Sequence, residues 1–142
     1  MGPCSPSTTP TPVQTPTPTC NASKFLDDSS KLWDKFSDIE KRAQATQRAS
    51  LSPVIGEMQQ VKRDYSYLEF PNCAQDLHDA GLAVMNTYIS AYLMFLGNEI
   101  QSRTQSEFDN AGRRLSEMID TQTELYYRMG LPRPTPTLTP SH

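Results

Sequence analysis

At residues 71–97 the sequence reads PNCAQDLHDAGLAVMNTYISAYLMFLG, and this stretch decides the fold. It opens with a helix-start pattern, because Asn72 is a favourable N-cap and Gln75 follows at the spacing of a capping box. It closes at Gly97, a residue type suited to the left-handed conformation that ends many helices. We therefore expect a helix over about residues 73–96.

The apolar face of this helix is wide. At ~100° per residue it covers roughly half of the circumference, more than the stripe of an ordinary surface helix. A membrane span is disfavoured, because the apolar run 82–96 falls short of the ~20 residues that a span requires. The sequence instead predicts a central helix that touches at least two neighbours. The face comprises Leu77, Gly81, Val84, Met85, Tyr88, Tyr92, Phe95 and Leu96.

Two amphipathic segments precede this helix. Residues 24–48 carry apolar side chains at alternating steps of three and four, the pattern of a helical seam. Residues 53–69 carry a similar stripe. There the sequence predicts that Ser52 caps the helix and that Pro53 takes its first position, where a missing N–H costs nothing.

A fourth helix is predicted over about residues 105–129. Thr104 and Glu107 have the spacing of a capping box, and Gly130 near a following proline is a strong stop signal. No segment alternates with a period of two, so no strand is expected. Four amphipathic helices with short loops predict an all-α fold, an antiparallel up-down-up-down four-helix bundle over residues 24–130.

Residues 1–23 and 131–142 differ in composition from the rest of the chain. They hold ten of its twelve prolines, mostly interspersed with threonine. Because proline fixes φ and removes a hydrogen-bond donor, we expect both tails to be disordered. Thr/Pro tracts are typical of stalks at cell surfaces, although generic disorder is the alternative interpretation.

Length and charge exclude some classes of function. The chain has 142 residues and a net charge of −3, and the 107 residues between the tails suffice for one domain with a core. The mild acidity argues against nucleic acid, which would call for a basic face. The first residues lack the basic start and apolar run of a signal peptide. We expect the natural N-terminus to differ from Met1, the alternative being a cytoplasmic protein that starts there.

The predicted topology brings two cysteines to one end of the bundle. Cys20 precedes the first helix and Cys73 lies in the first turn of the third, and these helices begin at the same end. A disulfide between them would close a loop of about 50 residues and stabilise the fold by about 3–4 kcal/mol in the chain-entropy model. Two unrelated thiols are the alternative, but the stalk favours an oxidising compartment.

Cys4 is left over from this pairing. One interpretation is the anchor cysteine of a lipoprotein whose signal peptide is absent, and the other is a free thiol. Asn21-Ala22-Ser23 matches the N-glycosylation sequon, a triplet that is common by chance.

Residues for catalysis or cofactor binding are not recognisable. The chain has two histidines, and a lone His78 beside an apolar face is more often a hydrogen-bonded core residue than a metal ligand, because zinc requires three or four ligands. No glycine-rich phosphate loop and no Gly-x-Ser-x-Gly elbow occurs. We expect no enzyme activity, no metal and no cofactor.

Aromatic residues near two helix ends are the best remaining indication of binding. Tyr67 and Tyr127 fall off the apolar stripes of their helices, at the end that carries the two cysteines. Tyrosine combines apolar area with a polar tip, which suits a binding surface. Core closure and a solvated rim are the alternative explanation for the aromatics at this end.

Three runs of sequence carry a resemblance: residues 48–63 (RASLSPVIGEMQQVKR), 70–78 (FPNCAQDLH) and 92–96 (YLMFL). The chain resembles a group of uncharacterised bacterial surface proteins, short helical domains behind a lipoprotein-type or Thr/Pro-rich N-terminus. The resemblance implies an extracytoplasmic helical domain, and it supplies neither an activity nor site residues. This chain departs from the group in lacking a signal peptide.

The sequence thus favours a non-enzymatic extracellular or cell-surface module that binds a protein partner or itself, or is structural. Membrane contact is expected only through an anchor outside the bundle. The alternative is a small-molecule-sensing bundle of a surface receptor, with its ligand between the helices near the aromatic end, and an enzyme is the least favoured class.

Overall fold

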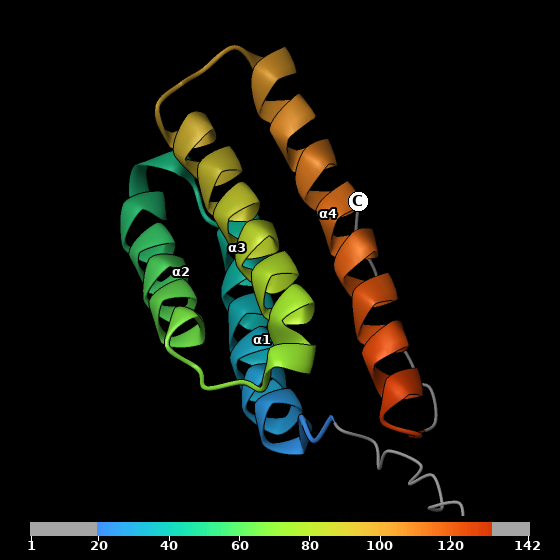
Figure 1. Cartoon of the computed structure of the whole chain (residues 1–142). Helices are drawn as coiled ribbons and strands as arrows, with labels where there is room; N and C mark the ends of the chain where they lie inside the picture. The colour runs from blue at the N-terminus through green and yellow to red at the C-terminus, as the bar shows by residue number, and fades with distance from the viewer. Residues whose placement is uncertain (1–19, 132–142) are drawn as a thin grey trace, which may run out of the picture.

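The computed structural model describes residues 20–131, which form four α-helices and no strand (Figure 1). The helices are α1 (Ser23–Gln44), α2 (Leu51–Ser66), α3 (Gln75–Leu96) and α4 (Gln101–Arg128). Consecutive helices run in opposite directions, which confirms the antiparallel up-down-up-down bundle. The predicted disorder of the tails concerns residues 1–19 and 132–142, which lie outside the described part of the chain.

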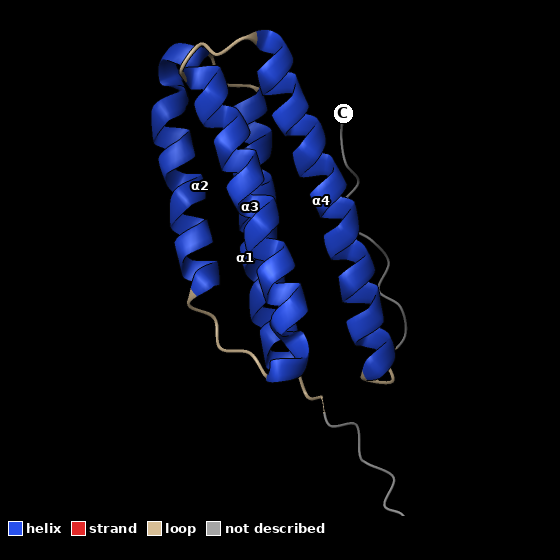
Figure 2. Cartoon of the chain, turned by 45° about the horizontal axis from the view of Figure 1, so that its top comes forward, coloured by secondary structure: helices blue, strands red, loops and turns tan. Residues whose placement is uncertain are grey.

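Helix α3 occupies the middle of the bundle. It lies between α2 and α4, with α1 behind it (Figure 2). It packs along both α2 and α4. It also reaches α1, because the Phe36 and Tyr88 ring centroids lie 6.3 Å apart. The wide apolar face is therefore needed to meet three neighbours.

The core follows most of the predicted stripes, but Phe95, predicted on the inner face of α3, is 38% exposed. Its most completely buried large side chains are Phe25, Phe36, Leu51, Met58, Val61, Tyr65, Val84 and Met85. Tyr65 is accommodated by Gly81 on the facing helix, where an added Cβ would lie 2.7 Å from the tyrosine Cζ. Its hydroxyl lies 3.5 Å from the carbonyl oxygen of Leu77, to which it donates a hydrogen bond.

The predicted N-caps are wrong at three helices. Helix α2 begins at Leu51 rather than residue 53, so Pro53 is its third residue and Ser52 lies inside it. Asn72 belongs to a 3-10 turn, Asn72–Ala74, that precedes α3. Short 3-10 turns run directly into both helices, so the chain enters them along backbone turns rather than through a capping side chain. Proline is tolerated in the first turn because the amides there have no partner within the helix.

Helix α4 also starts earlier than predicted, at Gln101 instead of residue 105. Thr104 lies inside it and donates its hydroxyl to the carbonyl oxygen of Ile100 at 3.4 Å, instead of capping the helix. Helix α1 ends earlier than predicted, at Gln44 rather than residue 48, because the chain leaves the helix to form a second 3-10 turn at Arg48–Ser50. These differences shorten the α3–α4 loop, lengthen the other two connections and leave the topology unchanged.

The left-handed residue after α3 is Asn98 and not the predicted Gly97. Asn98 has φ 60°, whereas Gly97 has an ordinary φ of −79°. The amide of Glu99 bonds the carbonyl of Met94 at 3.0 Å and that of Asn98 bonds the carbonyl of Phe95 at 3.2 Å, the pattern of a Schellman motif. Gly130 has φ 73° and ends α4 in the predicted manner.

The predicted disulfide between Cys20 and Cys73 is present. Their Cα atoms lie 5.8 Å apart, and they stand 53 positions apart in the sequence. Residues 20–23, predicted to belong to the N-terminal tail, pack on the bundle instead, since Cys20 and Ala22 are buried and α1 begins at Ser23. The disulfide therefore fixes the start of α1 against the start of α3.

Candidate functional site

A cleft opens between α1, α3 and α4. Its volume is about 610 Å³. It is formed by the last turns of α1 and α3 and the first half of α4, so it lies at the end of the bundle opposite the disulfide. The cleft is lined by Glu40, Ala43, Gln44, Thr46, Tyr88, Tyr92, Phe95, Gln105, Phe108, Asp109 and Gly112.

Helix packing explains why the bundle is open here. Helix α4 packs most closely on α3, and small buried residues occur on both helices, including Ala91 on α3 and Ala111 on α4. Helix α1 packs along α2, and it makes few backbone contacts with α4. Gly112 widens the opening further, because no atom lies within 4 Å of the position of its missing Cβ.

Aromatic rings from α3 and α4 line the cleft. The ring of Tyr92 is buried and meets the ring of Phe108 edge to face, with 4.9 Å between centroids. Burial raises the pKa of Tyr92 and of Tyr88, and the nearby carboxylate of Glu40 raises both further. Both phenols therefore stay protonated, and that of Tyr92 donates a hydrogen bond to the Glu40 carboxylate.

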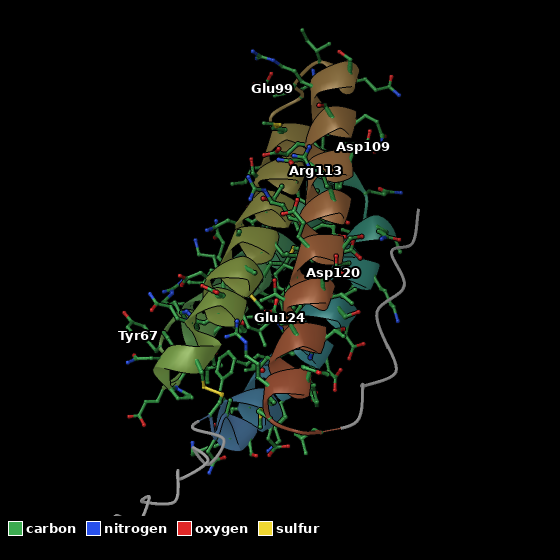
Figure 3. The ribbon with its side chains drawn as sticks, turned by 45° about the vertical axis from the view of Figure 1, so that its right-hand side comes forward. Tyr67, Glu99, Asp109, Arg113, Asp120 and Glu124 are labelled. Carbon is green, nitrogen blue, oxygen red and sulfur yellow. A yellow bond between two sulfur atoms is a disulfide. The ribbon has the colours of Figure 1, made fainter. Side chains whose placement is uncertain are left out.

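The cleft also contains two carboxylates, one on α1 and one on α4. Glu40 accepts a hydrogen bond from the Tyr92 hydroxyl at 3.1 Å and two from the Gln44 amide at 2.8 and 2.9 Å. Asp109, which projects from the upper half of α4 in Figure 3, accepts one from the Gln105 amide at 3.0 Å. Neither carboxylate forms an ion pair with another described residue.

A cation from the chain itself lies beside the cleft. The guanidinium carbon of Arg48 sits 4.5 Å from the centroid of the Phe95 ring. The Arg48 Nε also donates to the carbonyl oxygen of Phe95 at 3.0 Å, which fixes the guanidinium in place. One of the aromatic rings of the cleft thus already takes part in a cation–π contact.

The two tyrosines predicted from the sequence lie elsewhere. Tyr67 and Tyr127 are 79% and 83% exposed, at the end of the bundle that holds the disulfide. Tyr67 follows α2 and points away from the bundle in Figure 3, whereas Tyr127 lies in the last turn of α4. Because α3 separates α2 from α4, the structure does not join them into one compact patch. Cys4 lies outside the described residues.

His78 is a buried residue of the core. Its ring stacks between those of Tyr65 and Phe70, with centroids at 5.2 and 4.2 Å. Its Nε2 lies 3.3 Å from the carbonyl oxygen of Tyr65 and its Nδ1 3.4 Å from a carboxylate oxygen of Asp79. In the described part of the chain, no group of three or more His, Cys, Asp or Glu side chains is placed to hold a metal ion.

Sequence reasoning missed the cleft and its carboxylates. Tyr88, Tyr92 and Phe108 fall on apolar stripes, which predict that a residue faces inward but not whether a neighbouring helix covers it. Glu40 and Asp109 sit beside these stripes with amide side chains one turn away, Gln44 and Gln105.

Comparisons with known proteins provide no relative. Neither the protein-family models, nor the curated proteins, nor the solved structures contain a match to this chain. None of the helices between residues 20 and 131 combines the length and apolar character that crossing a membrane requires.

Proposed function

We propose that this chain is a non-enzymatic binding module that takes up a small ligand in the cleft between α1, α3 and α4. The observation that carries this proposal is the cleft, whose 610 Å³ lies within the range of about 300–1,000 Å³ that is typical of small-molecule sites. Its lining combines four aromatic rings with a few polar groups, as such sites do.

This proposal corresponds to a sensing bundle, with the ligand at the other end from the one that the sequence suggests. We further propose that the module acts outside the cell or at its surface. The Cys20–Cys73 disulfide supports this location, because disulfides persist mainly in oxidising compartments. The Thr/Pro composition of the two tails is an independent argument for a surface stalk.

A pair of glycine variants tests whether the cleft binds ligands. Gly112 and Gly56 both lie inside helices and have no atom within 4 Å of an added Cβ, but only Gly112 lines the cleft. Gly112→Leu should fill the cleft, and Gly56→Leu should leave it open. Both variants should stay folded and gain up to about 1 kcal/mol of stability, because glycine is the poorer helix former.

The measurement is a fragment screen on the ¹⁵N-labelled full chain, with cationic, neutral and anionic aromatic fragments followed by amide chemical shifts. We expect at least one class of fragment to shift the amides of Gln105 and Gly112 in the wild type and in Gly56→Leu. The same fragment should lose its effect in Gly112→Leu. A screen without any response at the cleft would refute the proposal, and so would a response that persists in Gly112→Leu.

A second candidate function is protein interaction or self-association through Tyr67 and Tyr127. The observation that favours it is their exposure of 79% and 83%, high for large aromatic residues. The double variant Tyr67→Ala with Tyr127→Ala should lower any concentration-dependent association seen in sedimentation, with little change in stability because neither side chain is buried. If the wild-type chain stays monomeric at high concentration, self-association through these tyrosines is excluded.

A further inference from the structure

The charged side chains that line the cleft are all negative. Its eleven lining residues include the carboxylates of Glu40 and Asp109 and no lysine or arginine. Arg48 is already stacked on Phe95. Arg113, which lies on the same helix as Asp109 (Figure 3), bonds the side chain of Asn110. The two carboxylates are held by hydrogen bonds from neutral amide and phenol groups, which leave their negative charge uncompensated.

The aromatic lining complements this charge. Tyr88, Tyr92 and Phe95 from α3 and Phe108 from α4 surround the same space as the two carboxylates. Aromatic faces attract cations, and the attraction grows as the site loses water. The Arg48–Phe95 stack shows that a cation rests against one of these four rings in the folded protein.

We propose that the cleft selects a small organic cation, such as a quaternary ammonium or a protonated amine attached to an apolar group. The cationic centre is attracted by Glu40 and Asp109, while the apolar part packs on Tyr88, Tyr92 and Phe108. This inference rests on the proposed function and names its ligand class. A metal ion fits less well, because the described residues place no group of three or more ligating side chains together.

Choline and its neutral carbon isostere, 3,3-dimethylbutan-1-ol, test the role of charge. The two probes have nearly the same shape and differ by one positive charge. In titrations of the ¹⁵N-labelled full chain, choline should shift the amides of Gln105 and Gly112 with an affinity at least tenfold higher than that of the alcohol. The difference should shrink at high salt, because exposed carboxylates are screened.

Variants of the carboxylates identify the groups responsible. Glu40→Gln keeps an oxygen that accepts the Tyr92 hydroxyl, and Asp109→Asn leaves the backbone of α4 unchanged, so both should fold. Each should weaken choline binding severalfold and leave the alcohol unaffected. Asp120→Asn is the matched control, because Asp120 is an exposed carboxylate of the same helix that does not line the cleft (Figure 3).

The outcomes separate this inference from the proposed function. Equal binding of choline and the alcohol, lost in Gly112→Leu, would overturn the selection for cations and keep the cleft as a binding site. Choline affinity that is unchanged in both Glu40→Gln and Asp109→Asn would also overturn the selection. The absence of any response to either probe or to the fragment screen would overturn both proposals.

Discussion

Gly81 is the residue at which the core has least room for change. The phenol ring of Tyr65, which is fully buried, occupies the space that any side chain at position 81 would need. Tyr65 in turn stacks on His78 and meets Phe25 and Trp33 edge to face, so it cannot move without disturbing three other rings. The lack of a Cβ at Gly81 thus leaves the space that the aromatic cluster of α1, α2 and α3 requires.

We expect Gly81→Ala to destabilise the fold by about 1–3 kcal/mol, the usual cost of overpacking a core. Gly56→Ala is the control, because its Cβ has open space and alanine favours the helix by about 1 kcal/mol. Urea unfolding of the two variants should therefore move the midpoint in opposite directions. A Gly81→Ala midpoint at or above that of the wild type would contradict the packing described for Tyr65.

At the scale of the helices, α1 and α2 are joined by an ion pair between Arg42 and Glu57. Both Nη atoms of Arg42 bond the Glu57 carboxylate, at 2.8 and 3.0 Å. The hydrogen bonds from Arg42 hold the pKa of Glu57 below its ordinary value of 4.5. The pair therefore stabilises the fold above about pH 4.5, and its contribution is lost as the pH falls through the lowered pKa of the folded protein.

We expect Glu57→Gln to lower the melting temperature slightly at pH 7, since the pair is exposed to solvent. The difference from the wild type should shrink as the pH falls below 4.5 and vanish below the lowered pKa of folded Glu57, where the wild-type carboxyl is protonated in both states. Glu117→Gln provides the comparison, as this glutamate is exposed and forms no side-chain bond in the described structure. A Glu57→Gln difference that stays constant down to pH 2 would rule out this contribution.

Sequence patterns predicted the elements of this bundle better than their ends. The stripes on α2 and α3 were sufficient because burial of an apolar face determines where a helix lies, and this signal is repeated over many residues. Each helix end depends on one or two backbone conformations instead. Asn98 takes the left-handed conformation, although Gly97 just before it is the residue type that adopts this conformation most easily. With Asn98 in this conformation, the amide of Glu99 bonds the carbonyl of Met94.

The cleft could not be predicted for a related reason. Whether Tyr88 and Tyr92 are covered depends on the spacing between α1 and α4, and that spacing follows from how closely α4 packs on α3. The distance between α1 and α4 depends on how three helices pack together, and the hydrophobic periodicity of a single helix does not reveal it. By contrast, the disulfide was predicted from the topology and from the oxidising compartment that the Thr/Pro tails suggest, because the direction of each helix determines which helix starts meet.

For the whole molecule, the disulfide is the strongest single constraint on the unfolded chain. Cys20 and Cys73 stand 53 positions apart in the sequence, and closing a loop of this size stabilises a fold by about 4 kcal/mol in the chain-entropy model, with typical measured values of 2–4 kcal/mol. The disulfide also holds residues 20–22 on the bundle, where Ala22 is buried and its carbonyl accepts the amide of Leu26 at 2.8 Å. Global stability and the order of the α1 start are therefore linked.

We expect the double variant Cys20→Ser with Cys73→Ser to unfold at a lower urea concentration than the oxidised wild type, by the equivalent of about 2–4 kcal/mol. Reduced wild type should match the variant, since both lose the same cross-link. Hydrogen exchange should increase first at the amides of residues 22–26 and remain slow in the middle of α3, because only the start of α1 depends on the covalent link to α3. If oxidised and reduced protein unfold at the same urea concentration, the bundle does not depend on this link, and the main structural argument for an oxidising compartment is lost.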